Sequence, residues 1–122
     1  MNYNQLALEA HKLHKGKLGT HSIPTLETRE DLSTYYSPGV AAPCLEIEKN
    51  PDLAYDYTWK SRTIAVVSDG SAVLWLGNLG WLASLPVMEG KCILFKEFGW
   101  VDAVPIVLNT QNPDEIIETV LR

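Results

Sequence analysis

Apolar residues follow two different spacings along the chain, and together they predict an α/β domain. Short runs rich in β-branched residues are typical of buried strands, and such runs occupy residues 63–68, 92–96 and 103–108. Apolar positions at helical spacing, bounded by helix-end signals, predict helices, and these cover residues 4–15, 28–34, 40–49, 79–89 and 112–122. The order of these elements favours a small, mostly parallel sheet flanked by helices, with a helical N-terminal arm.

Local signals at helix ends support these boundaries. Thr28 and Asp31 have the spacing of a capping box, in which each side chain bonds the backbone near the other. Residues 112–114 combine a cap, a proline and an acidic first turn, which is a strong helix start. Asn78 is the expected N-cap of the helix over 79–89, and Gly90 is expected just beyond its end.

Length and charge narrow the class of protein. The 122 residues suffice for one domain with its own core. The net charge is −5, from 10 basic and 15 acidic residues, which argues against nucleic acid as a partner. No apolar run approaches the roughly 20 residues of a membrane span, and the N-terminus does not read as a signal peptide. We therefore expect a cytoplasmic protein.

Two cysteines and two neighbouring histidines carry little functional signal. Cys44 and Cys92 lie outside any Cys-x-x-Cys pattern, and we expect both to be buried free thiols in a reducing compartment. His11 and His14 share a helix face, but no carboxylate or cysteine stands near enough in sequence to complete a zinc site. The sequence therefore predicts no metal site.

A tyrosine and a lysine are the residues best suited to proton chemistry. Tyr36 opens Tyr-Ser-Pro-Gly-Val (36–40), and Lys91 closes Pro-Val-Met-Glu-Gly-Lys (86–91). Free phenols and alkylamines titrate near pH 10, so an acid–base pair of this kind needs a dry cleft in which both groups meet. By spacing alone, simpler interpretations are a packed tyrosine and a solvated lysine near a helix end.

Four motifs in order give the chain a family resemblance. They are Tyr-Ser-Pro-Gly-Val-Ala (36–41), Ala-Val-Val-Ser-Asp-Gly-Ser-Ala-Val-Leu (65–74), Gly-Asn-Leu-Gly (77–80) and Pro-Val-Met-Glu-Gly-Lys (86–91). Over nearly its whole length the chain resembles the N-terminal substrate domain of small prokaryotic malic enzymes. The resemblance implies that Tyr36 protonates the enol of pyruvate and that Lys91 takes the proton from the malate hydroxyl. The implied reaction is oxidative decarboxylation of malate with NAD or NADP and a divalent metal, Mg or Mn.

The resemblance also implies that residues 1–122 lack the metal ligands and the nicotinamide-binding domain of the family. In that family a Glu-Asp pair and a further Asp hold the metal a few dozen residues after the lysine, and a nicotinamide-binding domain follows. No Glu-Asp pair follows Lys91 here. We therefore expect residues 1–122 to be the Tyr/Lys domain alone, with no bound cofactor and no activity in isolation. The family is dimeric through its N-terminal region, so a homodimer is expected, with a malate-like small molecule as ligand.

The segment 75–80 nearly matches the Gly-x-Gly-x-x-Gly loop of dinucleotide-binding folds. Trp75 replaces the first glycine, and an indole there would obstruct a pyrophosphate. The resemblance instead assigns this loop to the substrate domain. Gly77, Asn78 and Gly80 are thus predicted to bind a carboxylate of a malate-like ligand at a helix N-terminus.

Two aspartates are weaker candidates for metal or acid roles. Asp69 precedes Gly70, where an aspartate is most often a turn residue. Asp102 precedes the strand over 103–108, and we expect it to be a turn or ion-pair residue.

Three tryptophans stand out against the resembling family. Trp75 and Trp100 occupy positions where that family usually has glycine, and Trp81 one where it often has proline or alanine. If those positions need φ > 0, a side chain adds strain there. One interpretation is deliberate engineering, in which the indoles fill a cleft, bind an apolar ligand or form a subunit interface. The other is a divergent natural sequence with a repacked loop. The alternative function is therefore an engineered self-associating scaffold or an apolar-ligand module.

Overall fold

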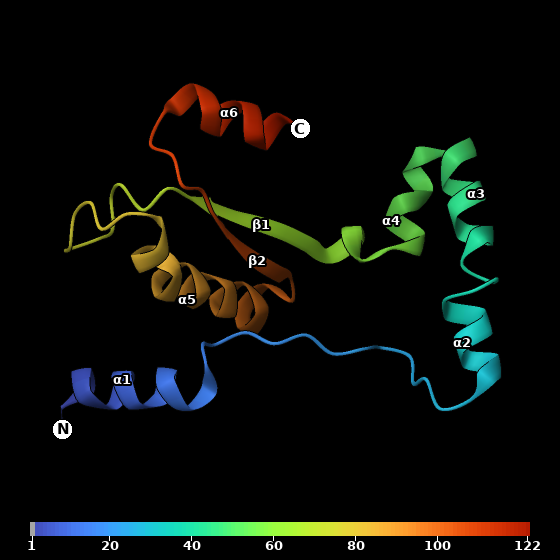
Figure 1. Cartoon of the computed structure of the whole chain (residues 1–122), viewed down its shortest axis with the longest axis horizontal. Coiled ribbons are helices and arrows are strands. Elements are labelled where there is room, and N and C mark those ends of the chain that lie inside the picture. The colour runs from blue at the N-terminus through green and yellow to red at the C-terminus, as the bar shows by residue number, and fades with distance from the viewer. Residues whose placement is uncertain (1) are drawn as a thin grey trace. The chain divides into compact units, whose positions relative to one another are not determined.

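The computed structural model describes residues 2–122, which form two units (Figure 1). One unit joins the residues up to Leu18 with Thr63–Arg122, and the other is Gly19–Arg62. The first unit contains α1 (Tyr3–His14), β1 (Thr63–Ser68), α5 (Trp81–Gly99), β2 (Asp102–Val107) and α6 (Pro113–Leu121). The second contains α2 (Arg29–Tyr35), α3 (Ala41–Lys49), η1 (Pro51–Leu53), α4 (Ala54–Tyr57) and η2 (Trp59–Arg62).

A two-stranded parallel sheet organises the first unit. The ladder between β1 and β2 runs from the pair Thr63–Asp102 to the pair Ser68–Val107. Helix α5 connects the strands and packs against both of them (Figure 1). Its buried residues Ser84, Met88 and Cys92 recur every four positions and therefore share one helix face. The α/β class with a small parallel sheet is confirmed.

The N-terminal arm is tied to α5 at the end of α1. The backbone N–H of Lys17 donates to Glu89 Oε2 at 2.9 Å, and Lys17 Nζ donates to the carbonyl of Pro86 at 2.8 Å. The cationic last turn of α1 contains His11, Lys12 and His14, as expected for the negative end of a helix dipole.

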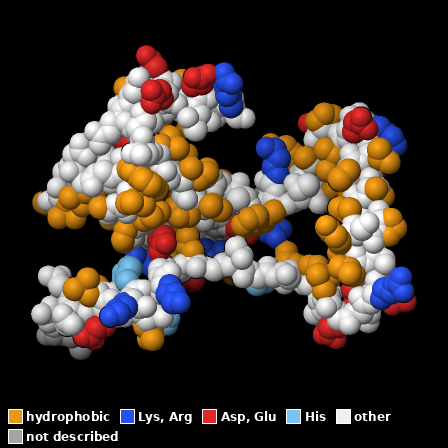
Figure 2. Space-filling model, in the orientation of Figure 1, with side chains coloured by type: hydrophobic (Ala, Val, Ile, Leu, Met, Phe, Trp, Pro, Cys, Tyr) orange, Lys and Arg blue, Asp and Glu red, His pale blue; other side chains and the backbone are white. Residues whose placement is uncertain are grey.

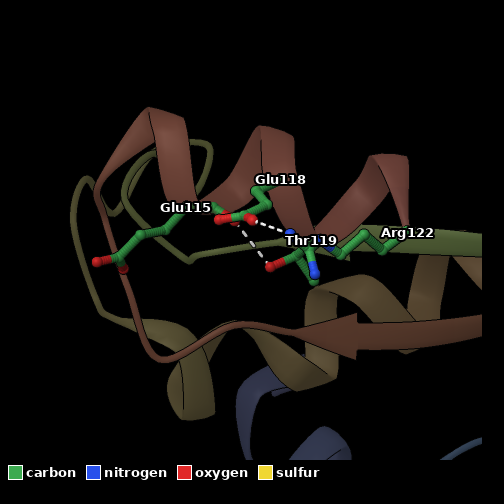
Figure 3. Close-up of polar contacts among 4 residues, drawn as sticks. All are labelled: Glu115, Glu118, Thr119 and Arg122. Carbon is green, nitrogen blue, oxygen red and sulfur yellow. Dashed lines mark hydrogen bonds and ion pairs between the residues drawn. The ribbon is translucent and has the colours of Figure 1, made fainter.

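Helix α6 forms as its sequence predicts. Asn112 Oδ1 accepts the N–H of Asp114 at 3.0 Å, which caps the helix start. On the polar face, Arg122 pairs with Glu118, and Thr119 Oγ1 donates to the carbonyl of Glu115 at 2.7 Å (Figure 3).

Most local predictions are confirmed to within a residue or two. The strands over 63–68 and 103–108 are β1 and β2, and the first helix, the helix from 40 and the helix from 112 are α1, α3 and α6. The capping box is present, because Thr28 accepts the N–H of Asp31 and Asp31 accepts that of Thr28.

The predictions around Gly90 were wrong. We expected a helix ending at residue 89 and a strand over 92–96, but α5 is one helix that continues to Gly99. The 92–96 run combines Cys92, which is buried in line with Met88, with Leu94 and Phe95, which are exposed on another face of α5. An apolar run alone cannot distinguish a strand from a helix. The helix ends at Trp100, whose left-handed backbone lets its N–H bond back to Lys96.

The predicted N-cap was also displaced. Gly80, rather than Asn78, precedes the first helical residue of α5. Asn78 Oδ1 instead accepts the N–H of Gly80 at 3.2 Å, which fixes the loop two residues before the helix.

The two cysteines differ, and one prediction was wrong. Cys92 is a fully buried free thiol, as expected, whereas Cys44 is exposed. The reason is that α3 buries none of its residues. Burial, followed by the negative charge of Glu89, raises the pKa of the Cys92 thiol. Among the described residues, no helix has the length and apolar character needed to cross a membrane.

The unit Gly19–Arg62 has no core of its own within the described chain. None of its residues is buried, and Figure 2 shows hydrophobic side chains exposed over its helices. Its large apolar side chains that are more than half exposed are Ile23, Leu26, Tyr35, Tyr36, Leu45, Tyr55 and Tyr57. Folding gains little from apolar groups left in water, so this unit needs a further surface to cover it.

Gly70 allows a close backbone contact in the first unit. Its φ is +71°, it is buried, and a Cβ there would lie 2.1 Å from the carbonyl oxygen of Gly80. The Gly70 carbonyl accepts the N–H groups of Leu79 at 3.1 Å and Gly80 at 3.2 Å. The turn after β1 is therefore joined directly to the segment that starts α5.

We expect Gly70→Ala to lower the free energy of unfolding by roughly 2 to 5 kcal/mol, from the left-handed backbone and the overpacked contact together. Urea denaturation followed by circular dichroism measures this change. Gly77→Ala is the matched control, because Gly77 also has a positive φ, +77°, but no atom within 4 Å of its Cβ position. It should cost about 1 to 2 kcal/mol. Equal losses of stability at both positions would contradict the claim that the Gly80 carbonyl leaves no room for a Cβ at residue 70.

Candidate functional site

Three segments meet at the carboxyl ends of the two parallel strands. Residues 69–70 follow β1, residues 108–112 follow β2, and the loop 77–80 leads into α5. Hydrogen bonds join them: Leu108 N–H donates to the Ser68 carbonyl at 2.9 Å, and the Gly70 carbonyl accepts from Gly80. Ligands of open α/β sheets bind at this edge, which is why we take it as the candidate site.

Asp69 shapes the turn after β1. Its Oδ1 accepts the N–H of Ser71 at 3.0 Å and the Ser71 hydroxyl at 2.8 Å. The backbone bond from Ser71, and then the hydroxyl bond, lower the pKa of the Asp69 carboxyl. The prediction that Asp69 is a turn residue is confirmed.

The loop before α5 is closed by its own backbone. Val73 and Gly77 exchange N–H···O=C bonds of 2.8 Å in both directions, forming an antiparallel bridge. Trp75 stands at the tip of this small turn with φ +69°, and its side chain is 94% exposed.

The predicted substrate residues lie in one loop, but the backbone donors of Gly77 and Gly80 already have partners. Gly77 N–H donates to the Val73 carbonyl, and Gly80 N–H donates to the Gly70 carbonyl and to Asn78 Oδ1. The first turn of α5 has N–H groups without intrahelical acceptors, as every helix does. A carboxylate at this site would therefore be held by the N–H groups of residues 81–83.

Gln111 belongs to the candidate site and was not predicted. Asn78 Nδ2 donates to Gln111 Oε1 at 3.0 Å, and Gln111 Nε2 donates to Asn78 Oδ1 at 2.9 Å. The two residues are 33 positions apart, so no local pattern could have linked them. The only signal in the sequence is indirect, because the loops that follow two parallel strands leave the sheet at the same edge.

Lys91 lies in the middle of α5 rather than after it, and its side chain is exposed. Four apolar residues at helical spacing share its face, and all are substantially exposed. We call these residues the Lys91 stripe: Val87, Leu94, Phe95 and Phe98. Helix α5 thus has one apolar face against the sheet and a second one uncovered.

Tyr36 ends α2 in the other unit. Its N–H donates to the Leu32 carbonyl at 2.9 Å, and its side chain is 68% exposed. The following turn is tight, because a Cβ on Gly39 would lie 2.4 Å from the Thr34 carbonyl oxygen. Tyr36 and Lys91 therefore belong to different units, and their pairing stays a prediction.

No group of three or more His, Cys, Asp or Glu side chains that could hold a metal occurs among residues 2–122. Asp102 forms an ion pair with Lys96, 2.5 Å from Nζ to Oδ1, which confirms its expected ion-pair role. His11 Nδ1 lies 2.7 Å from the Ala7 carbonyl oxygen, within its own helix.

The three unusual tryptophans do not form one cluster. Trp81 is the first residue of α5 and Trp100 follows its last, so the helix separates them by about 28 Å at 1.5 Å per residue. Trp100 has φ +57° and is 85% exposed, whereas Trp81 is half-buried. The structure therefore does not bring all three indoles into one ligand site.

We expect Trp75→Gly to be more stable than Trp75→Ala by about 1 kcal/mol, because only glycine relieves the left-handed strain. Trp100 should behave in the same way. Trp59 is the control, since its φ is not positive, and there Gly should be less stable than Ala by about 0.5 to 1 kcal/mol. Thermal denaturation of the six variants measures the differences, and the same sign at all three positions would refute the strain argument.

Comparison with known proteins identifies relatives of this chain. Residues 15–121 match the family described as malic enzyme, N-terminal domain. The chain is 52% identical over 120 residues to a bifunctional malic/malolactic enzyme of Bacillus subtilis, covering 98% of this chain and 29% of the relative. It is 50% identical over 117 residues to an NADP-dependent malic enzyme of Escherichia coli, covering 95% of this chain and 15% of that protein.

Solved structures similar to this chain are also malic enzymes. The crystal structure of an NAD-dependent malic enzyme from Thermotoga maritima superposes with a TM-score of 0.90 at 48% identity, covering 93% of this chain and 32% of that one. The chain thus spans less than a third of the length of each of these relatives.

Proposed function

Because this chain belongs to the malic enzyme family through its N-terminal domain, we propose that it supplies the Tyr/Lys half of a malate-binding active site. The proposed reaction is oxidative decarboxylation of malate to pyruvate with NAD or NADP and a divalent metal. Relatives include both NAD-dependent and NADP-dependent malic enzymes, so the choice of nicotinamide is left open. The cytoplasmic location expected from the sequence stays a prediction.

The position of Lys91 within an uncovered apolar stripe is the observation that carries this proposal. A surface that covers the Lys91 stripe removes water from around the amine, and a desolvated amine favours its neutral form. A neutral amine is the form that can accept a proton from the malate hydroxyl. The same helix therefore supplies the base and the apolar surroundings that would activate it.

Tyr36 is the proposed proton donor to the enol that remains after carbon dioxide leaves. Tyr36 is exposed at the end of α2, beside the tight turn at Gly39, so its hydroxyl is accessible to a ligand. A divalent metal, when bound, would stabilise the negative charge that develops on the substrate oxygen. We expect the metal and the nicotinamide to be held outside these 122 residues, as the family resemblance implies.

We expect the purified chain to form no NADH or NADPH from malate with Mn²⁺ or Mg²⁺ present. A chimera, in which the chain replaces the matching N-terminal residues of the Bacillus subtilis relative, should form NADH or NADPH. In that chimera Tyr36→Phe and Lys91→Ala should each lower kcat by about 10²- to 10⁴-fold, because each removes a proton-transfer group. Absorbance at 340 nm follows the reaction.

Each of the two residues has a matched control. Tyr35→Phe changes the neighbouring phenol, and Lys96→Ala removes another lysine of α5. Both should stay within a few-fold of the parent chimera. Turnover by the isolated chain that Lys91→Ala abolishes would show that the metal and nicotinamide are held by these residues after all.

We further propose that the chain forms a homodimer. The support is the unit Gly19–Arg62, in which no residue is buried, together with the uncovered Lys91 stripe. Exposed apolar patches of this kind usually mark an interface, and two-fold dimers are the commonest soluble oligomers.

Light scattering at about 100 µM should report a dimer, since that concentration populates any dimer with a Kd near 1 µM. The dimer should persist in the double variant Trp75→Gly/Trp100→Gly, because the inherited surface forms it. A clean monomer of the parent chain would refute the dimer, and loss of the dimer only in the double variant would favour the next proposal.

The second candidate function is an engineered scaffold that associates, or binds an apolar ligand, through Trp75, Trp81 and Trp100. The exposure of two of these indoles on strained backbone favours it, because such a side chain gains nothing within its own unit. Since α5 separates Trp81 from Trp100, the indoles would act at two separate places on the unit.

A further inference from the structure

We propose that Glu89 is a positioning residue that holds the N-terminal arm on α5 and so sets where the chain leaves the first unit on its way to Tyr36, an inference that rests on the Tyr/Lys function proposed above. Glu89 lies within the motif Pro-Val-Met-Glu-Gly-Lys (86–91). Neither the motif nor the family resemblance gives this glutamate a role, but its contacts with the arm do.

Glu89 accepts a hydrogen bond from the backbone of the arm. Its Oε2 accepts the N–H of Lys17 at 2.9 Å, across 72 positions of sequence, and the bond is partly buried. An ionised acceptor makes such a bond stronger than a neutral one. One turn earlier on α5, the carbonyl of Pro86 accepts Lys17 Nζ at 2.8 Å. Both the backbone and the side chain of Lys17 are therefore held on α5, and we call these two contacts the Glu89 lock.

The residue before Lys17 fits closely against the same carboxylate. Gly16 has φ +109°, and a Cβ there would lie 3.0 Å from both Oε1 and Oε2 of Glu89. A side chain at residue 16 would therefore strain the backbone and press on the carboxylate. The absence of a Cβ at Gly16 lets the arm approach Glu89 closely enough for the Lys17 bond to form.

The Glu89 lock lies just before the chain enters the second unit. Residues 19–62 form that unit, and the chain returns to the first unit at Thr63, where β1 begins. The ladder with β2 fixes the return, and the Glu89 lock fixes the departure. No residue of Gly19–Arg62 is buried, so the two attachments matter more here than in a unit with its own core. A segment held at both ends has fewer conformations than one held at a single end.

The expected consequence is on proton transfer by Tyr36 rather than on the position of Lys91. Lys91 belongs to α5 itself, so its place does not depend on the arm. Loss of the Glu89 lock would free one attachment of the unit that contains Tyr36. A misplacement of about 1 Å can lower the rate of a catalysed step by about 100-fold, so a moderate loss of kcat is expected.

The kinetic test uses the chimera with the Bacillus subtilis relative described above. Glu89→Ala should lower kcat by about tenfold and leave the KM for malate nearly unchanged, because the lock does not touch the substrate. Glu89→Gln should stay close to the parent, since its amide oxygen can still accept the Lys17 N–H. Glu97→Ala is the matched control, because it removes another carboxylate from α5, further along the helix. It should leave kcat at the parent value.

A double-mutant cycle separates positioning from general damage to the fold. In the Tyr36→Phe chimera, Glu89→Ala should lower kcat by less than about twofold more, because no phenol remains to be placed. A loss of the same size in both backgrounds would overturn the positioning role. Parent-like kcat in the single variant Glu89→Ala would overturn it as well.

The Glu89 lock can also be measured without catalysis, in the 122-residue chain labelled with ¹⁵N. Hydrogen exchange of the Lys17 N–H should become several-fold faster in Glu89→Ala and stay near the parent rate in Glu89→Gln. Unchanged exchange in Glu89→Ala would refute the lock. If the chimera is inactive, or if Tyr36→Phe leaves its kcat unchanged, the proposed function fails and the catalytic role of Glu89 fails with it. Exchange at Lys17 would then still show whether Glu89 holds the arm.

Discussion

A single backbone contact, between Gly70 and Gly80, determines how the first unit is built. With no side chain at residue 70, the turn after β1 can lie against the segment that starts α5, where a Cβ would come within 2.1 Å of a carbonyl oxygen. Two N–H groups then donate to the Gly70 carbonyl. The contact fixes where α5 begins relative to the sheet, and so it also fixes which residues of α5 face the strands and which face away.

The rotation of α5 about its own axis connects the fold to the proposed chemistry, because it decides which residues of the helix face the sheet. One face places Ser84, Met88 and Cys92 against the strands, while the Lys91 stripe remains in water. A helix that is apolar on both sides is normally buried on both sides. Together with the absence of any buried residue in Gly19–Arg62, this indicates that the described residues leave apolar surface for further protein to cover.

How far the sequence could predict this structure depends on how local each signal is. The capping box at Thr28 and Asp31 and the helix start at Asn112 involve residues three or fewer apart, and both were predicted correctly. The 92–96 segment was mistaken for a strand, because a short apolar run can have the same composition in a helix. Cys44 was predicted to be buried from its residue type alone, although burial depends on what covers α3.

The candidate site shows the same limit. Its motifs placed Asn78 at the start of a helix, which begins at Trp81 instead, after the loop 77–80. They could not show that the N–H groups of Gly77 and Gly80 are already used inside the unit. Gln111 was missed because its link to Asn78 depends on the two parallel strands ending side by side, and no short-range pattern encodes that.

The exposure of both proposed catalytic groups bears on where catalytic power would come from. Tyr36 and Lys91 are each surrounded by water within their own units, and in water a phenol and an alkylamine exchange protons poorly at neutral pH. Desolvation and a nearby opposite charge are what would change this, and neither is supplied by the motif that contains the residue. The motifs therefore supply the chemical groups, whereas their activation would be a property of the assembled surfaces that enclose them.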